Sequence, residues 1–428
     1  MKLTPFFLCT FSILFAARAE PPGLALDTVT QAVLAHNPSI QEARAKWEAA
    51  RQRVPQAAAW DDLKVSASTR IGRFVDVATN SFTDQMLSVE QMIPLSGKNQ
   101  SRARIAAAEA LGGLEELRRK ELDVVGKARA AYFRLAKSYA LLDFNRANEA
   151  SLTQTLDISR ARFEVGHQAQ ADVLTAEGEL VRIIETRRDL ARALSDDETH
   201  LKVLMNRDPF APLGKPVAAD THAALPSVDR LRTLLLSRRP EVRMAEASLT
   251  GARAKLELAK REWIPDPAVN IGTQRYNGAA QAASEVTAGI SFNVPWLNRK
   301  KYRAEESEAA LGVEAAQRAL EGARTEALGM LRDHLEKIET FHHHVELFGE
   351  RLIPNARQTV QATRTNNESG QTGFLNLVLA QRNLREVEAT AREHLADYQT
   401  ALAELDALIG TDLRDFHPAN ETIHRKQK

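Results

Sequence analysis

The sequence contains few residues that build disulfides or aromatic cores. It has one cysteine, Cys9, among 428 residues, and aromatic side chains make up 6% of the chain. Cys9 lies in a segment expected to be cleaved, so the mature protein is expected to have no disulfide, no thiol chemistry and no cysteine for a lipid anchor. The low aromatic content argues against a large, compact, aromatic-rich core.

Long apolar runs and an excess of one charge are also missing. After residue 19 no stretch of 18 apolar residues occurs, which excludes a transmembrane helix but leaves open a membrane barrel, whose strands alternate. The formal net charge is +1, so no basic excess points to nucleic acid. The content of 44% apolar and 26% charged residues is ordinary for a soluble protein.

The first 19 residues have the three-part pattern of a secretory signal. Lys2 supplies the positive start, residues 6–16 supply the apolar stretch, and residues 17–19 (Ala-Arg-Ala) supply the cleavage site. Cleavage removes two cations, Lys2 and Arg18, and changes the formal charge from +1 to −1. A buried N-terminal helix is the alternative interpretation.

Two long helical hairpins dominate the expected structure. No proline interrupts the stretch from Gly97 to Arg162, which is rich in Ala, Leu, Glu, Arg and Lys. At 1.5 Å per residue a continuous helix there is about 100 Å long, more than a compact domain holds. The hairpins are expected at residues 97–206, with a turn at 165–170, and at residues 298–410, with a turn at 369–373.

The returning helix of the second hairpin carries a narrow apolar stripe. Its members are three or four residues apart, which is coiled-coil spacing. Any antiparallel coiled coil has this spacing, because the period fixes packing and not purpose. The stripe consists of Leu384, Val387, Ala391, Leu395, Tyr398, Leu402, Leu405 and Ile409.

Four short segments alternate in the manner of β-strands. The most regular is 286–294, where one face has Val, Ala, Ile, Phe and Val and the other has Thr, Gly, Ser and Asn. One face therefore suits lipid and the other suits water. The expected strands are 63–73, 84–93, 269–275 and 286–294, with a polar loop at 75–83.

The pattern of the first half restarts after one linker rich in proline and glycine. Pro240 follows Pro38 by 202 residues, and Gly370 follows Gly166 by 204 residues, with two strands and a hairpin in the same order in each half. We interpret this as a two-fold internal duplication. The predicted divisions are a signal at 1–19, a first repeat at 20–206, a linker at 207–224, a second repeat at 225–413 and a tail at 414–428.

Four strands per chain are too few for a membrane barrel. Open sheet edges are not tolerated in lipid, and known spanning barrels begin at about eight strands. Copies of the chain must therefore pool their strands, and three copies supply twelve. A soluble four-stranded sheet packed on helices is the alternative that periodicity leaves open.

No group of residues has the arrangement of a catalytic or metal site. His342, His343 and His344 are consecutive, and consecutive residues on a helix point about 100° apart, so they do not converge on one ion. A solvated stretch is expected there, with weak metal contact as the alternative. No nucleophile elbow or phosphate loop is found. The chain is expected not to be an enzyme, with no catalytic residue, no cofactor and no metal site.

Tryptophan and paired acids mark the junctions of helix and strand. Trp60, Trp263 and Trp296 all fall there, and tryptophan favours a membrane interface, with ordinary packing as the alternative. Paired carboxylates such as Asp61-Asp62 are expected to be helix-end charges, because adjacent side chains diverge on a helix.

Three motifs together resemble the TolC-like outer-membrane efflux proteins, also called outer membrane factors. The resemblance covers about residues 24–413. The motifs are VGHQAQADVLTA at 165–176, MIPLSGKNQSR at 92–102, and the Asn-Pro and Arg-Pro helix starts at Asn37 and Arg239. The Pro-Leu-Ser-Gly-Lys of residues 94–98 is similar to the heavy-metal cation-efflux (CzcC/CusC-like) branch.

This resemblance implies a mainly α fold with a small β part. It implies a homotrimer whose twelve-stranded barrel crosses the outer membrane, in contact with its lipid, in a Gram-negative bacterium, with a twelve-helix tunnel in the periplasm. The partners implied are a periplasmic adaptor (membrane fusion protein) and an inner-membrane pump of the resistance-nodulation-division (RND) type, with heavy-metal cations as cargo. A periplasmic coiled-coil adaptor or structural protein is the alternative; an adaptor, however, has one hairpin flanked by two β halves.

The turns of the two hairpins are the expected functional ends. Adaptors of the family dock there tip to tip. Alternatively, the two turn glycines only end their helices. The contact residues implied are Val165, Gly166, Asp172, Leu174, Gly370 and Asn376.

The second turn departs from that of well-studied relatives, which narrow it with two acidic residues and lock it with an arginine. The matching positions hold Asn376, Leu379 and Thr372, which are the expected lining of the aperture. Since none is charged, closure is expected to rest on packing and neutral hydrogen bonds and to depend weakly on pH and divalent ions.

Overall fold

The computed structural model describes residues 23–69, 83–217, 225–277 and 282–411. The predicted signal at 1–19, most of the predicted loop at 75–83 and the predicted tail at 414–428 lie outside these residues. Contacts divide the chain into two units. Unit 1 comprises residues 1–32, 131–220 and 348–396, and unit 2 comprises residues 33–130, 221–347 and 397–428.

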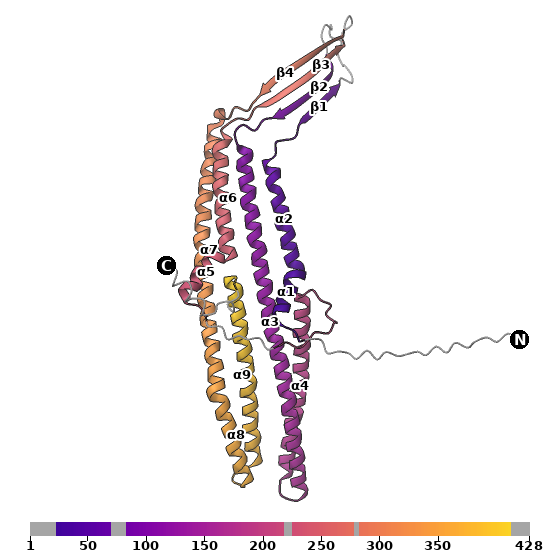
Figure 1. Ribbon diagram of the computed structural model, residues 1–428, viewed down its shortest axis with the longest axis vertical. Coiled ribbons are helices and arrows are strands. Elements are labelled where there is room, and N and C mark those ends of the chain that lie inside the picture. Colours follow the sequence, from indigo (N-terminus) through magenta and orange to yellow (C-terminus); the bar gives the residue numbers. More distant parts are fainter. Residues whose placement is uncertain (1–22, 70–82, 218–224, 278–281, 412–428) are drawn as a thin grey trace, which may run out of the picture. The chain divides into compact units, whose positions relative to one another are not determined.

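Helices and strands follow one order twice along the chain (Figure 1). The first series is α1 (Leu26–His36), α2 (Pro38–Ala58), β1 (Lys64–Thr69), β2 (Thr83–Met92), α3 (Lys98–Glu164) and α4 (Gln170–Leu204). The second series is α5 (Val228–Arg238), α6 (Pro240–Glu262), β3 (Ala268–Asn277), β4 (Ala282–Ser291), a 3-10 turn (Pro295–Asn298), α7 (Arg299–Leu347), a π-helical turn (Phe348–Leu352), α8 (Ile353–Glu368) and α9 (Phe374–Ile409).

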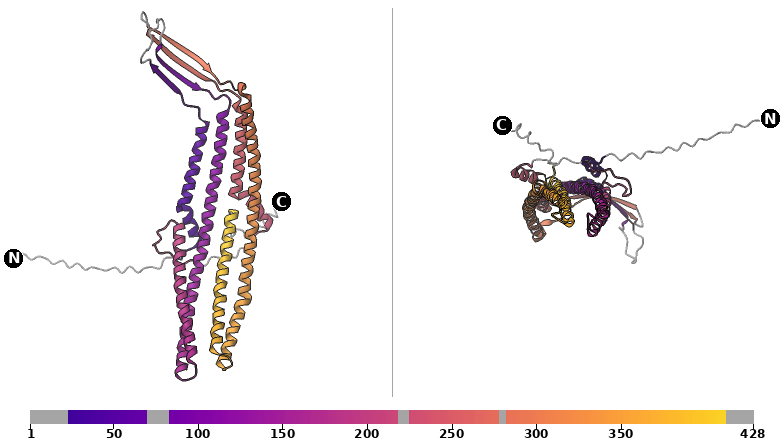
Figure 2. Two further views of the ribbon diagram at one scale, coloured as in Figure 1. Left: turned by 180° about the vertical axis from the view of Figure 1, so that it is seen from behind. Right: turned by 90° about the horizontal axis from the view of Figure 1, so that it is seen from below.

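The two predicted hairpins are confirmed. α3 has 67 residues and is continuous, as expected for a stretch without proline. In unit 1 its C-terminal part runs beside α4, and α8 runs beside α9 (Figures 1 and 2). The second hairpin differs in that the π-helical turn at residues 348–352 separates α7 from α8. Within the described ranges, no helix combines the length and the apolar character needed to cross a membrane.

The restart of the helix at Asn37-Pro38 has a local cause. Pro38 occupies the first turn of α2, where its missing N–H has no partner to lose. The Oδ1 atom of Asn37 accepts a hydrogen bond from the Ser39 backbone N–H at 3.0 Å, which caps the new helix.

The four strands form one antiparallel sheet in the order β1-β2-β3-β4. The register places Val65, Val89, Ile271 and Ala288 in one row. Neighbouring rows on this face add Leu87, Val286 and Ile290. The other face carries mainly Ser, Asn, Gln, Gly and Thr, together with Lys64, Met86, Glu90 and Glu285. The apolar face is uncovered, because Val65, Leu87, Ile271, Val286 and Ile290 are 48–76% exposed.

The strand boundaries differ from prediction mainly at the end of the sheet. β4 ends at Ser291, so residues 292–294, predicted as strand, lie outside it. Pro295 opens the 3-10 turn directly afterwards, and a proline supplies no ladder hydrogen bond. β3 is longer than predicted and spans Ala268–Asn277. β1 is described only to Thr69.

The predicted stripe on α9 is buried only at its C-terminal end. Leu405 and Ile409 are fully buried in a core that they share with α5, α6 and α7 in unit 2. In unit 1, Leu395 is 42% exposed. The coiled-coil spacing thus predicted the helix correctly, but this single chain does not cover the whole stripe.

The linker is tied to the N-terminal leader by a buried tyrosine. In unit 1 the hydroxyl of Tyr132 lies 2.9 Å from the carbonyl oxygen of Leu24 and 2.5 Å from that of Val217. Leu24 also forms a parallel bridge with Pro216. Burial raises the pKa of Tyr132, which keeps its hydroxyl a neutral donor.

A buried acid joins helix and sheet in unit 2. Asp266, just before β3, accepts hydrogen bonds from the backbone N–H and the hydroxyl of Ser96, both at 2.8 Å. Lys98 lies 3.4 Å from Asp266 and 3.5 Å from Glu262. We call this group the Asp266 joint. The sequence motif of residues 94–98 therefore has a structural role here.

Gly97 is required at this joint for two reasons. Its φ is +74°, and a Cβ atom would fall 2.4 Å from Nη1 of Arg261. That guanidinium donates a hydrogen bond to the Ser96 carbonyl at 3.0 Å, so a side chain at residue 97 would displace it.

Replacing Asp266 is expected to lower the free energy of unfolding and to make that free energy less dependent on pH in the acid range. Burial alone would raise the pKa of Asp266, but the hydrogen bonds from Ser96 and the charge of Lys98 lower it below 3.8. Its contribution is therefore present above the unfolded pKa and lost as pH falls through the lowered folded pKa. Asp266→Asn should cost about 1–3 kcal/mol at neutral pH, measured by guanidinium unfolding, and the difference from wild type should vanish in acid.

Asp229→Asn is the matched control, because that side chain is 96% exposed and should change stability by less than about 0.5 kcal/mol. Equal losses in the two variants would contradict the role of the joint.

Candidate functional site

The two hairpin turns in unit 1 have the same backbone geometry. Gly166 and Gly370 both have φ of +76°. The N–H of His167 bonds the Arg162 carbonyl at 2.8 Å, and the N–H of Gln371 bonds the Asn366 carbonyl at 2.8 Å. These six-residue loops are glycine-dependent helix ends. No atom lies within 4 Å of a Cβ built on either glycine, so backbone conformation, not space, requires glycine.

The first turn presents apolar side chains to the outside. Val165 is 66% exposed and Leu174 is 58% exposed. Asp172 lies in the first turn of α4 and is half-buried, where a carboxylate favours the positive helix end.

The second turn is held by neutral hydrogen bonds. The Thr372 N–H donates to the Asn366 carbonyl at 3.2 Å, and Nδ2 of Asn367 donates to the Thr372 carbonyl at 3.0 Å. Thr372 is half-buried and Asn376 is exposed, while Leu379 is 46% exposed. All three candidate aperture residues therefore lie at or just beyond this turn.

An apolar cluster connects the two hairpins close to their turns. Its side chains come from three helices of unit 1 and are at most 9% exposed. The sequence analysis did not identify it, because each helix contributes only one or two residues. The cluster consists of Leu156, Val173, Ala176, Phe374 and Val378.

Next to this cluster, α4 and α9 are joined by salt bridges that no sequence pattern predicted. Glu179 of α4 has a side chain only 7% exposed, and its carboxylate pairs with Arg382 and with Arg385, the latter at 3.3 Å. Arg182, one turn along α4, contributes a third cation at 2.9 Å. We call this group the Glu179 cluster.

The charges of the Glu179 cluster are partly desolvated. Burial and the neighbouring Arg382 charge lower the pKa of Arg385, against the effect of Glu179. The hydrogen bond to Glu179 raises the pKa of Arg382. The acid is the common partner of both arginines, so its loss would leave two cations close together. One weak signal was present in sequence: Glu179 and Arg382 are 203 residues apart, which is near the repeat offset.

The side chains of the histidine run at 342–344 do not share one environment. His342 and His343 are exposed, and His342 lies beside Glu346 at 3.7 Å and the ring of Tyr398 at 5.5 Å. In the part of the chain that the structure describes, no group of three or more His, Cys, Asp or Glu residues is placed to hold a metal ion.

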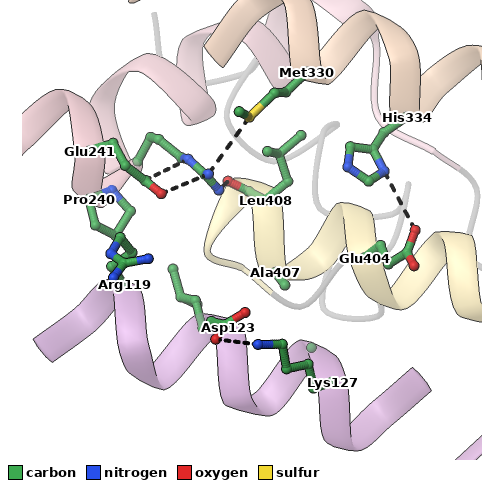
Figure 3. Close-up of a pocket in the computed structure, with 13 residues that line it drawn as sticks. Arg119, Asp123, Lys127, Pro240, Glu241, Met330, His334, Glu404, Ala407 and Leu408 are labelled. Atoms are coloured by element: carbon green, nitrogen blue, oxygen red, sulfur yellow. Dashed lines mark hydrogen bonds and ion pairs between the residues drawn. The ribbon is translucent and has the colours of Figure 1, made fainter. Parts of the chain in front are cut away.

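A pocket of about 340 Å³ in unit 2 surrounds the end of α9 (Figure 3). Arg239, of the predicted Arg-Pro start, donates to the Leu408 carbonyl at 3.2 Å and pairs with Glu241 at 2.7 Å. Asp123 pairs with Lys127 at 2.9 Å. Burial lowers the pKa of His334. These paired charges stabilise a helix end, and the pocket shows no convergent reactive groups.

Comparison with known proteins identifies the class. The family model described as outer membrane efflux protein matches residues 29–207 and 231–411. The chain therefore belongs to the outer membrane efflux protein family. It is also similar to the outer membrane protein TolC of Vibrio cholerae, at 21% identity over 66% of each chain. Membership of this family makes the chain an outer membrane efflux protein, which acts in transport.

Similar proteins differ in what their names say they export. AprF, the alkaline protease secretion protein of Pseudomonas aeruginosa, is 22% identical over 82% of this chain and 74% of its own. OpmQ, the pyoverdine export outer membrane protein of Pseudomonas putida, is 25% identical over 89% and 80%. NccC, a nickel-cobalt-cadmium resistance protein of Alcaligenes xylosoxydans xylosoxydans, is 22% identical over 76% and 71%.

The fold matches solved structures over most of its length. The crystal structure of CusC has a TM-score of 0.76 and 16% sequence identity, with 90% of this chain and 92% of that chain covered. At this identity the likeness concerns the fold alone.

Removing the charge of Glu179 is expected to loosen the second hairpin. Glu179→Gln keeps the size of the side chain but leaves Arg382 and Arg385 without their anion. Backbone amides at residues 374–385 should then exchange hydrogen faster, as measured by mass spectrometry. Glu177→Gln is the control, because Glu177 pairs with Arg160 inside the first hairpin and is 40% exposed. Unchanged exchange in Glu179→Gln would show that packing alone holds α9.

Proposed function

We propose that this protein is the outer-membrane exit duct of a tripartite efflux system. The observation that supports this most is the sheet: its apolar face is uncovered, with Val286 76% exposed, and β1 and β4 each pair with one strand. Lipid covers such a face, and only closure into a barrel removes such edges. Three copies supply twelve strands, and their helices form the periplasmic tunnel.

The repeated element order supports an internal duplication. The family model matches two segments, 29–207 and 231–411, which correspond to the divisions 20–206 and 225–413. The signal at 1–19, the linker at 207–224 and the tail at 414–428 complete the proposed organisation. Export through a cleaved signal brings the chain to the periplasm and the outer membrane of a Gram-negative bacterium.

The hairpin turns are the proposed contact with a periplasmic adaptor. Val165 and Leu174 are exposed apolar residues beside a glycine turn, which suits a partner that buries them. Gly166, Asp172, Gly370 and Asn376 complete the contact. Thr372, Asn376 and Leu379 line the aperture, which closes by packing and neutral hydrogen bonds, with the Glu179 cluster behind it.

The proposed cargo is heavy-metal cations, delivered by an RND-type pump. The support is the motif at residues 94–98 and the similarity to NccC, whose name states nickel-cobalt-cadmium resistance. The motif acts here through the Asp266 joint, and other relatives are named for protease secretion and pyoverdine export.

The competing function, a periplasmic adaptor or structural protein, fits less well. An adaptor has one hairpin between two β halves, whereas this chain has two hairpins and one four-stranded sheet.

The channel proposal predicts a heat-labile trimer that conducts ions. Protein extracted from outer membranes in mild detergent should have the mass of three chains by light scattering. In planar bilayers it should form pores. Because the positions of Thr372, Asn376 and Leu379 carry no charge, low millimolar divalent cations should block these pores weakly. A monomer without conductance would overturn the proposal, and strong divalent block would overturn only the account of the aperture.

The cargo proposal predicts metal sensitivity on deletion of the gene. The deletion strain should lose tolerance to at least one of zinc, cobalt, cadmium, copper and silver, and complementation should restore it. Organic solvents and detergents serve as the comparison panel. Unchanged metal tolerance with lost solvent tolerance would replace metals by organic cargo.

A further inference from the structure

The two open edges of the sheet continue into surfaces of opposite charge. β1 begins and β4 ends at the same end of the sheet, as the register pairs Lys64 with Glu90, Met92 with Ala268 and Ala268 with Ser291. The chain enters β1 through residues 60–63 and leaves β4 through residues 295–300. We call these segments the acidic edge and the basic edge.

The acidic edge consists of Trp60, Asp61, Asp62 and Leu63. Trp60 is 60% exposed and Leu63 is 56% exposed. Both carboxylates are exposed, and among the described residues no cation pairs with them.

The basic edge mirrors this composition with the opposite charge. Trp296 is 43% exposed and Leu297 is 83% exposed. Arg299 and Lys300 follow and are exposed, and no acid in the described ranges pairs with them. The first turn of α7 contains no acidic residue, although the positive end of a helix favours acids. Within the described part of one chain, these cations therefore have no acidic partner.

The middle of the same sheet shows how such a junction is completed. Between β2 and β3, Lys98 follows the departing strand and pairs with Glu262 and Asp266, which precede the arriving strand. Arg299 and Lys300 follow Lys98 by 201 and 202 residues, which is the offset between the two halves of the chain. They follow β4 as Lys98 follows β2. If β1 of another copy followed β4, as β3 follows β2, the acids before that strand would be Asp61 and Asp62.

We propose that the basic edge of one chain binds the acidic edge of a second copy. Arg299 and Lys300 pair with the second copy's carboxylates, while Trp296 and Leu297 pack against its tryptophan and leucine. This inference rests on the proposed trimeric barrel and names the residues that select the neighbouring chain. Because the two edges differ, the interface is heterologous and closes into a ring.

Complementary charge favours a second copy over lipid as the partner. Anionic headgroups would suit the basic edge, but they would repel the acidic edge at the same end of the sheet. A second copy neutralises both edges with one contact.

Charge reversal tests the pairing in the full-length protein. The variants are Asp61→Lys with Asp62→Lys, Arg299→Glu with Lys300→Glu, and all four together. Either single-edge reversal places like charges on both sides of each seam, so the trimer band should be lost on mild heating in SDS at a temperature that wild type survives. The fourfold variant restores opposite charges and should recover the band.

Asp157→Lys with Asp189→Lys is the matched control for the acidic edge. Both acids are exposed in unit 1, and the change in net charge equals that of Asp61→Lys with Asp62→Lys. It should leave the trimer intact. Failure of the fourfold variant to recover, with wild type still trimeric and conducting, overturns this inference alone. Loss of the trimer only in Arg299→Glu with Lys300→Glu, relieved by neutral lipid, also overturns it and assigns the basic edge to headgroups. A monomeric wild type would instead overturn the proposed function.

Cross-linking gives a second readout that does not depend on stability. Because Cys9 is the only cysteine in the sequence and lies in the predicted signal, Asp61→Cys and Lys300→Cys introduce unique thiols. A chain carrying both should give covalent dimers and trimers with a short bis-maleimide, whereas either alone should give monomers. Equal cross-linking by the single variants would contradict a heterologous seam.

Discussion

An open antiparallel sheet with one apolar face needs cover on that face and on both edges, and this constraint governs the rest of the molecule. Five of its large apolar side chains are 48–76% exposed in the single chain, and β1 and β4 each lack a second neighbour. Such edges invite pairing with any exposed strand. In the proposed barrel, lipid would cover the face and other copies would cover the edges, so assembly would complete the sheet.

Near the hairpin turns of unit 1, the helices are stabilised by apolar packing together with buried ion pairs. The cluster of Leu156, Val173, Ala176, Phe374 and Val378 supplies apolar contact, and the Glu179 cluster adds a desolvated ion pair. A buried charge pair contributes little net stability but is costly to break on one side. This combination favours one arrangement of α4 and α9 strongly over slightly shifted ones.

Local patterns predicted much of the fold, and contacts distant in sequence escaped prediction. The absence of proline predicted α3, Pro38 and Pro240 predicted the helix starts, and alternation predicted which residues of β1 and β4 share a face. The Glu179 cluster was missed because α4 and α9 meet only in three dimensions and single charged residues on a helix are usually solvated. Residues 94–98 were noticed for their family resemblance, but only the structure shows that Ser96 and Lys98 bind Asp266. Phe292 and Val294 continue the alternation up to Pro295, so periodicity placed β4 at 286–294, whereas the strand spans Ala282–Ser291.

The proposed internal duplication would explain why the two junctions differ in burial. Within one chain, Lys98 and Asp266 are brought together by folding, so their side chains are 12% and 10% exposed and never need to exist apart. Under the proposed assembly, the equivalent charges at the outer edges would have to stay hydrated until another copy binds, because an unpaired buried charge costs on the order of several kcal/mol. Exposed pairs such as Asp61-Asp62 and Arg299-Lys300 meet that condition. If the two halves were identical, the junction between β2 and β3 would be the same as the proposed junction between β4 and the neighbouring β1. Divergence of the halves would let the first junction form on folding and the second on assembly.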